Sequence, residues 1–496
     1  MRTQLRQFSG ETAVYGVATI LQRFLSFLLT PFYTHFLLPE ELGVQVDLFV
    51  LVAFLLILGN AGMESAFFKF DSVAESDGER RSVLWNAIGV NWLVAGLIGL
   101  TLLVVPDILR LTGISRIPET YSGLIRMTGL ILALDSMSMV PLALLRMRKR
   151  AGKFGVIKIA SVIVTVLGNV ILVGILDLKL TGIFISALAG SIAQFLLSVP
   201  FLRLMLPIRF DAGLRRSMLT FGIPTIGSGL SMIALQLVDR IIVERFVGFE
   251  GLGLYQANYR LGIAMVVFVS VFEFAWRPFF LQQASAKNAR ELFARIFTYF
   301  NLIAGGILLA VSFFIPNIAA IPIPFTEDAT FIARTYWPGL GLVPIVLAAY
   351  LFNGWYTNFI AGIYIEKRTG SLLWLTAGGV AVEVVLCLLL VPSIGIAGGA
   401  WATLVAYVAM AIGLLAFVSR VYPVSYEWRR VGLLLGLCGL LFGLDRLFFE
   451  YGDLSLTTAL GRLGLLLLYP VGLLLLGFLR REEIGILRRL ATRGRS

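Results

Sequence analysis

Hydrophobic tracts about as long as a bilayer is thick alternate with short polar segments along almost the whole chain. A transmembrane helix needs about 20 consecutive, mainly apolar residues, and the tracts reach this length repeatedly. They predict fourteen membrane-spanning helices, of which the thirteenth is short. The tracts are residues 14–36, 44–68, 84–105, 121–145, 156–176, 180–202, 219–238, 252–276, 296–315, 337–356, 372–391, 396–418, 431–444 and 463–479. The predicted fold class is an all-α polytopic membrane protein.

A weak internal repeat divides these tracts into two series of six, with two left over. Its anchors are Phe36, Glu40, Leu42 and Gly43, which recur 210 residues later as Phe246, Glu250, Leu252 and Gly253, and Lys149-Arg150-x-Gly152, which recurs 218 residues later as Lys367-Arg368-x-Gly370. Because six is even, both series keep the same orientation, and an axis along the membrane normal would relate them. We expect two pseudo-symmetric lobes, residues 1–205 and 206–420, followed by two extra helices and a basic cytoplasmic tail in residues 421–496.

Composition and charge agree with this organisation. Apolar residues make up 58% of the chain and charged residues 14%, and the mean hydropathy is +0.90, far from the soluble average. Thirty of the 41 lysines and arginines fall in alternate connecting segments, which places both termini in the cytoplasm by the positive-inside rule. They form no basic stripe with interleaved aromatic residues, which argues against a nucleic-acid partner. We expect a multi-pass protein of the cell (inner) membrane, in contact with membrane lipids.

Enzymatic and metal chemistry is not indicated. The sequence has no Walker lysine loop, no Gly-x-Ser-x-Gly elbow and no Cys/His cluster. His35 is the single histidine, and Cys387 and Cys438 lie inside apolar tracts, where cysteine is typically a small buried apolar residue. We expect no enzyme activity, no metal and no cofactor. Transport would instead be coupled to a proton or sodium gradient or to the membrane potential.

Charged residues inside the tracts are the candidate functional residues, because a charge in the bilayer core costs roughly 3 kcal/mol or more. Arg23 in the first tract and Arg260 in the eighth could together hold one anionic headgroup in a cavity between the lobes. The alternative is an internal ion pair with a buried acid. Arg126 is a third candidate for headgroup binding. The pair Thr30-Pro31 predicts a kink in the first helix, suited to gating.

Four acids inside the tracts are candidates for ion coupling. They are Asp135, Glu383, Glu64 and Glu273. The first two lie near mid-span and are the stronger candidates. The other two lie near tract ends: Glu273 precedes Arg277 by four residues, the spacing of a simple helical ion pair, and Glu64 is similarly close to Lys69.

A motif surrounds Arg23. It consists of Gln22-Arg23, Thr30-Pro31, Thr34 and Leu38-Pro39-Glu40-Glu41-Leu42-Gly43, and Asp239-Arg240 closes the seventh tract. This combination resembles the polysaccharide flippases of the multidrug/oligosaccharidyl-lipid/polysaccharide exporter superfamily. The resemblance implies alternating-access transfer of a polyprenyl-diphosphate-linked oligosaccharide from the cytoplasmic to the periplasmic leaflet, for O-antigen, capsule or exopolysaccharide assembly. It also implies a monomer that works beside a polysaccharide polymerase and glycosyltransferases.

Other functions stay open. The first spans lack the asparagine- and arginine-rich pattern expected of lipid II flippases, which disfavours lipid II as cargo. A cation-coupled multidrug exporter of the same superfamily would typically have twelve spans and an acid, not an arginine, in the first. A non-transporting membrane scaffold is a further alternative. An integral glycosyltransferase would need a loop domain with acidic catalytic residues, and these connecting segments are too short for one.

Overall fold

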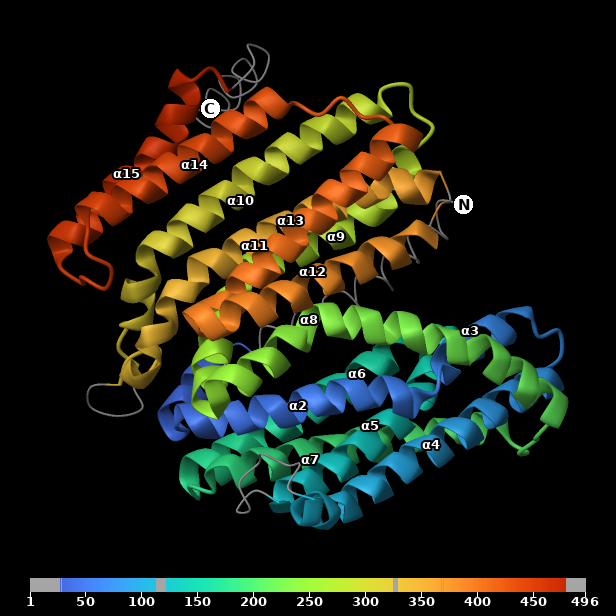
Figure 1. Cartoon of the computed structure of the whole chain (residues 1–496). Coiled ribbons are helices and arrows are strands. Elements are labelled where there is room, and N and C mark those ends of the chain that lie inside the picture. The colour runs from blue at the N-terminus through green and yellow to red at the C-terminus, as the bar shows by residue number, and fades with distance from the viewer. Residues whose placement is uncertain are drawn as a thin grey trace, which may run out of the picture. The chain divides into compact units, whose positions relative to one another are not determined.

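The computed structural model describes residues 27, 29–112, 122–323, 329–366, 368 and 370–478. These residues form helices joined by short connections, with one isolated β-bridge between Pro322 and Thr330 (Figure 1). The predicted all-α class is confirmed. Most of the first predicted tract lies outside the described residues.

Thirteen spans in the described part of the chain are long and apolar enough to cross a membrane, and they correspond in order to the second through fourteenth predicted tracts. The α-helices are α2 (Pro39–Asn60), α3 (Met63–Val73), α4 (Asp77–Thr112), α5 (Ser122–Met147), α6 (Ala151–Asn169), α7 (Lys179–Ser198), α8 (Ala212–Leu261), α9 (Ile263–Gln283), α10 (Ala289–Ala319), α11 (Val343–Ile365), α12 (Gly370–Ile394), α13 (Ile396–Val421), α14 (Trp428–Phe448) and α15 (Leu456–Leu475). The π-helix η2 (Val170–Ile175) and the 3₁₀ helices η3 (Val199–Met205) and η4 (Arg334–Leu342) extend α6, α7 and α11.

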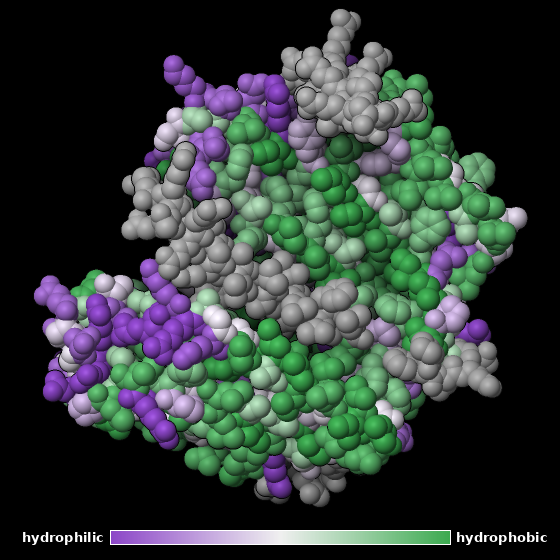
Figure 2. Space-filling model, turned by 180° about the vertical axis from the view of Figure 1, so that it is seen from behind, coloured by the Kyte–Doolittle hydropathy of each residue, from purple (hydrophilic) through white to green (hydrophobic). Residues whose placement is uncertain are grey.

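An exposed apolar stripe on α4 shows which face this helix offers to lipid. Leu93, Leu97, Leu100 and Val104 follow each other at helical spacing, and each is more than half exposed. A contiguous apolar surface of this kind marks a membrane-facing side. Figure 2 shows hydrophobic residues covering most of the visible face, with hydrophilic residues gathered toward its edges. The chain is a multi-pass membrane protein.

Two predicted spans contain breaks that their apolar runs do not reveal. Ala61 and Gly62, with φ of 50° and 69°, separate α2 from α3 inside the second tract. The prediction of one helix over the eighth tract, 252–276, was wrong in its first residue and its continuity. The helix there begins directly after Gly248, whose φ of 85° interrupts α8, and Gly262 separates it from α9. A hydropathy count averages over such turns, because glycine adopts the left-handed region without lowering the local apolar content.

Two compact units make up the described chain. The first comprises the described residues of Met1–Ala257 and Glu383–Gly399, and the second those of Asn258–Val382 and Ala400–Ser496. A core in the first unit forms around the fully buried Met63, Phe67 and Leu84. In the second unit the Phe297 ring contacts four other aromatic rings from α11 and from the segment at the start of α14. The division into two six-helix lobes stays a prediction.

The repeat spacing recurs in the helix boundaries. α2 begins at Pro39, and the helix after the kink in α8 begins at Phe249, 210 residues later. α3 ends at Val73 and α9 ends at Gln283, again 210 residues later. The two corresponding segments therefore have the same length, although each is broken at a different place.

The repeated helices contact each other through matched positions. A Cβ atom added at Gly43 would lie 1.8 Å from the carbonyl oxygen of Phe249, and one added at Gly253 would lie 1.8 Å from the carbonyl oxygen of Pro39. In the repeat, Gly43 corresponds to Gly253 and Pro39 corresponds to Phe249. Each glycine therefore contacts, in the other helix, the residue that lies four positions before its own repeat equivalent. This reciprocity is that of an isologous two-fold contact. Glycine is needed at both positions because only a residue without a side chain allows backbones to approach this closely.

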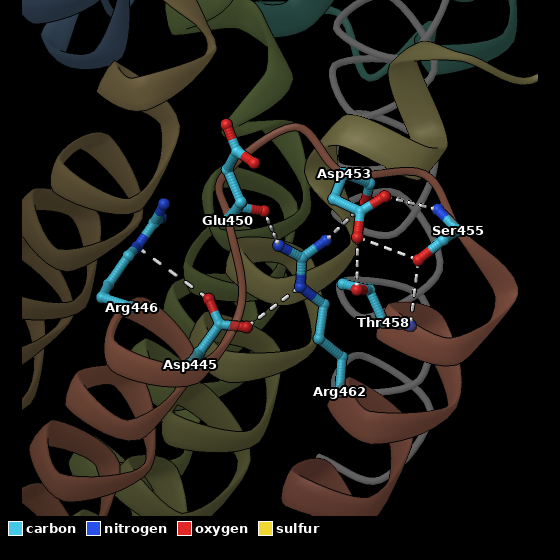
Figure 3. A network of polar contacts seen from close by, with 7 residues as sticks. All are labelled: Asp445, Arg446, Glu450, Asp453, Ser455, Thr458 and Arg462. Atoms are coloured by element: carbon cyan, nitrogen blue, oxygen red, sulfur yellow. Dashed lines mark hydrogen bonds and ion pairs between the residues drawn. The ribbon is translucent and has the colours of Figure 1, made fainter.

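A buried arginine holds the hairpin of α14 and α15 (Figure 3). The Arg462 side chain is 1% exposed and donates from Nε to Asp445 Oδ1 over 3.0 Å. Its remaining nitrogens donate to the main-chain oxygens of Glu450, at 3.1 Å, and Asp453, at 3.4 Å. Hydrogen bonds from Thr458 and Ser455 hold the pKa of the Asp453 carboxyl below its usual range. The ion pair and the loop carbonyls together fix the turn between the last two helices.

Candidate functional site

The described end of the first helix is buried in the first unit. Thr30 is 1% exposed and Pro31 is buried, and the Thr34 hydroxyl donates to the Pro31 carbonyl over 2.9 Å. Tyr33 links this segment to α6 through a hydrogen bond of 3.2 Å to Asn169. Arg23 lies outside the described residues. The gating role of Thr30 and Pro31 stays a prediction.

A polar cluster lies between α5, α6 and α7, around one of the predicted coupling acids. The Asp135 carboxylate lies near the Ser191 hydroxyl and within electrostatic reach of the Lys158 ammonium. Lys158 in turn donates to Gln194 Oε1 over 2.8 Å. Each of these groups comes from inside a membrane-spanning helix, where polar residues need partners because no water replaces them. We call these four residues the α5–α7 cluster.

Asp135 and Lys158 carry opposite charges, but the structure describes no direct ion pair between them. Acids inside a membrane span are candidates for ion pathways, and a coupling role for Asp135 stays a prediction.

A second polar cluster lies at the middle of α8. Asp239 and Arg240, 1% and 6% exposed, form an ion pair of 2.7 Å. The hydroxyl of the fully buried Tyr255 donates to Asp239 Oδ2 over 2.6 Å, and Arg240 Nε donates to Gln256 Oε1 over 3.1 Å. The sequence pointed to Asp239-Arg240 only as part of the motif shared with the polysaccharide flippases, and it did not predict the contacts with Tyr255 and Gln256. We call these four residues the α8 cluster.

The α8 cluster extends toward α12 and the other mid-span acid. Glu383 is 1% exposed, and the thiol of the fully buried Cys387 lies one turn further along the same helix. Cys387 is within electrostatic range of both Glu383 and Asp239. A buried carboxylate is costly unless a cation balances it, and Arg240 supplies that cation to Asp239. Ion coupling through Glu383 or Asp135 stays a prediction.

The remaining predicted residues lie in different places. Glu273 pairs with Arg277 at 2.7 Å, as their spacing predicts. Glu64 was expected beside Lys69, and this was wrong: Glu64 pairs with Arg146 from the end of α5. Helix packing places the Arg146 guanidinium beside the Glu64 carboxylate, so this ion pair forms in place of one within α3. Sequence spacing cannot predict a contact between helices that are far apart in the chain.

Two predicted arginines are at helix ends. Arg260 lies in the last turn of α8 and is half-buried, and Arg126 lies near the start of α5 with an exposed side chain. Their headgroup-binding roles stay predictions.

Sequence reasoning missed two charged residues inside spans. Lys158 lies within the predicted apolar tract 156–176, and Arg462 directly precedes the tract 463–479. The position of Lys158 inside its tract was a usable signal. For Arg462 the signal was an aspartate, Asp445, near the end of the preceding tract, since a short turn brings the end of one helix beside the start of the next.

Comparisons with known proteins agree with this architecture. The family model described as "Polysaccharide biosynthesis protein" matches residues 10–284. No curated protein sequence matches the chain.

Solved structures share the fold at low sequence identity. The chain is similar to the lipid II flippase MurJ in an inward closed conformation, with 16% identity, a TM-score of 0.66, and coverage of 92% of this chain and 98% of that one. It is similar to an inward-facing multidrug resistance MATE family transporter of the MOP superfamily, with 14% identity, a TM-score of 0.62, and coverage of 80% of this chain and 94% of that one. The chain is also similar to a MOP superfamily transporter from Pyrococcus furiosus that has a binding pocket of reverse polarity, with 14% identity, a TM-score of 0.56, and coverage of 83% of this chain and 95% of that one. With the family model matching more than half of its residues, the chain belongs to the polysaccharide biosynthesis protein family.

Proposed function

We propose that this protein is a flippase that moves a polyprenyl-diphosphate-linked oligosaccharide from the cytoplasmic to the periplasmic leaflet of the inner membrane. The glycan would enter O-antigen, capsule or exopolysaccharide assembly, beside a polymerase and glycosyltransferases. The protein would act as a monomer without enzymatic chemistry, with both termini in the cytoplasm. The observation that carries the proposal is the family match over residues 10–284, on a chain whose fold is that of MOP transporters.

The paired charges inside the spans support this proposal. Acids at mid-span are costly, and a bundle with a purely structural role does not require them. A transporter of anions requires cations that can bind and release the cargo, and nearby acids can control when those cations are available. Arg23, Arg260 and Arg126 would hold the diphosphate, since a guanidinium binds phosphate oxygens in a fork. The α5–α7 cluster and Glu383 would carry the coupling proton or sodium ion. Alternating access would follow from movement of the repeated halves.

The proposal is tested in cells that make a surface glycan with this protein as their single flippase. Depletion should leave lipid-linked glycan on the cytoplasmic leaflet, and re-expression should clear it. The variant Gly439→Ala, which has open space around the added methyl group, is the matched control and should clear it equally well. Unchanged leaflet distribution after depletion would refute the flippase function.

A cation-coupled multidrug exporter is the second candidate, because multidrug MATE structures share the fold. It predicts that depletion raises the cellular concentration of cationic drugs and leaves lipid-linked glycan distribution unaltered. The two candidates therefore give opposite results in the same strain.

A further inference from the structure

A cleft of about 490 Å³ opens between the end of α3 and the start of α8 in the first unit. It is lined by Lys69, Phe70, Arg216, Ser217, Thr220 and Phe221. The lining thus combines two cations, two hydroxyls and two phenyl rings, and includes no carboxylate. Its volume is in the range of small-molecule sites. The orientation set by the basic segments puts this end of the first unit on the cytoplasmic side.

Among the residues that the structure describes, neither Lys69 nor Arg216 forms an ion pair with an acid. α3 carries Glu64 and Asp71 on either side of Lys69, but Glu64 pairs with Arg146, and Asp71 pairs with Arg148 at 3.3 Å. The structure describes no ion pair for Lys69, whose ammonium instead lies 3.8 Å from the ring centre of Phe221 and 5.6 Å from that of Phe70.

This arrangement favours a phosphate-bearing ligand. An exposed cation–π contact is worth about 0.5–1 kcal/mol, so a phosphate can draw the ammonium away from the Phe221 ring at small cost. Arg216 can bind two phosphate oxygens in a fork, and it comes from the opposite wall of the cleft. The rings of Phe70 and Phe221, packed edge to face at 6.3 Å, offer an apolar surface beside the anion. A lipid diphosphate has this combination of strong negative charge and adjoining hydrocarbon.

We propose that this cleft is a cytoplasmic loading site, where Lys69 and Arg216 bind the diphosphate of the lipid-linked cargo before transfer into the bundle. The inference rests on the proposed flippase function and adds a site that lies outside the buried clusters. Anionic phospholipids carry the same phosphate chemistry, so the test must separate the two sources.

The first experiment measures binding of farnesyl diphosphate to the full-length protein in phosphatidylcholine nanodiscs. The double variant Lys69→Ala/Arg216→Ala should bind at least about tenfold more weakly, because two charged hydrogen-bond donors are lost. The matched control is Lys153→Ala/Arg215→Ala. Lys153 also lies over a phenylalanine ring, 5.1 Å from Phe201, and neither control residue lines the cleft.

The control should bind like the unmodified protein, and Lys69→Arg should keep most of the affinity because it keeps the charge. Equal affinity of the unmodified protein and the Lys69→Ala/Arg216→Ala variant would overturn the proposal. Nanodiscs in which phosphatidylglycerol replaces part of the phosphatidylcholine distinguish the two sources. Persistence of farnesyl diphosphate binding there supports a cargo site, whereas its displacement assigns the cleft to bulk lipid and overturns the loading role.

A flipping assay separates this inference from the function on which it rests. In reconstituted vesicles the double variant should need at least about tenfold more cargo for half-maximal rate, with the saturated rate retained. An unchanged concentration dependence would refute the loading site and leave the flippase function intact. Failure of the unmodified protein to move lipid-linked glycan would refute the proposed function itself.

Discussion

Substituting alanine for Gly43 or Gly253 tests the reciprocal contact between the repeated helices. At either position the new Cβ would lie 1.8 Å from a main-chain carbonyl oxygen of another helix, whereas a Cβ atom essentially never lies within 3.0 Å of an atom to which it is not linked through neighbouring bonds. The obstructing atoms are backbone, so no side chain can rotate away, and the helices must separate. Overpacking of this kind costs about 3 kcal/mol of unfolding free energy.

The double variant Gly43→Ala/Gly253→Ala gives the sharper result. One separation of the helices relieves both clashes, so the double variant should cost about 3 kcal/mol rather than the roughly 6 kcal/mol expected of independent sites. The measurement is reversible unfolding in mixed detergent micelles, followed by tryptophan fluorescence. Gly439→Ala, with no atom within 4 Å of its added Cβ, should be neutral or slightly stabilising. Additive costs, or single costs as small as that of Gly439→Ala, would refute the reciprocal contact.

Three further predictions concern charged residues of the helices and of the first predicted tract. Arg462→Met should lower the unfolding free energy by about 3–5 kcal/mol, because it removes the hydrogen-bonded cation of the buried Asp445 and leaves only the longer ion pair with Arg446, at 3.9 Å. Adding Asp445→Leu should recover most of the loss in the same micelle titration, and no recovery would contradict the prediction. Asp135→Asn should reduce gradient-driven flipping at least about tenfold at normal membrane abundance, while an unchanged rate would remove its coupling role. Arg23→Ala should abolish flipping with normal abundance and Arg23→Lys should keep part of it, whereas loss of folded protein from the membrane would indicate a structural ion pair instead.

The helix order could be predicted from the sequence because lipid imposes a strong and local requirement. Each span must bury its backbone polar groups within itself, so an apolar run of sufficient length is nearly enough to identify it. The breaks at Gly62 and Gly248 could not be predicted in this way, since glycine alters the backbone path without altering hydropathy. The sequence repeat identified Gly43 as a recurring residue but gave no physical reason for it. The structure supplies the reason, because the Phe249 carbonyl oxygen lies too close to leave room for a side chain.

Prediction of the site was less complete, because it depends on partners that come from distant helices. Asp135 and Glu383 were predicted as mid-span acids, and the structure places both inside helices, Asp135 half-buried in α5 and Glu383 buried in α12. Their neighbours were not foreseen, because Ser191 and Lys158 meet Asp135 only through the packing of three helices. Glu64 shows the opposite case, in which a plausible neighbour in sequence was replaced by a guanidinium from another helix.

Gradient-driven movement of a lipid-linked glycan can be measured with the purified protein alone. The purified protein is reconstituted into sealed vesicles with a polyprenyl-diphosphate-linked oligosaccharide, and the cargo in each leaflet is quantified. We predict transfer when a proton gradient, a sodium gradient or a membrane potential is imposed, and none when ATP is supplied without any of them. Transfer that requires ATP alone, or no transfer under any gradient or potential, would refute gradient-driven flipping by this protein.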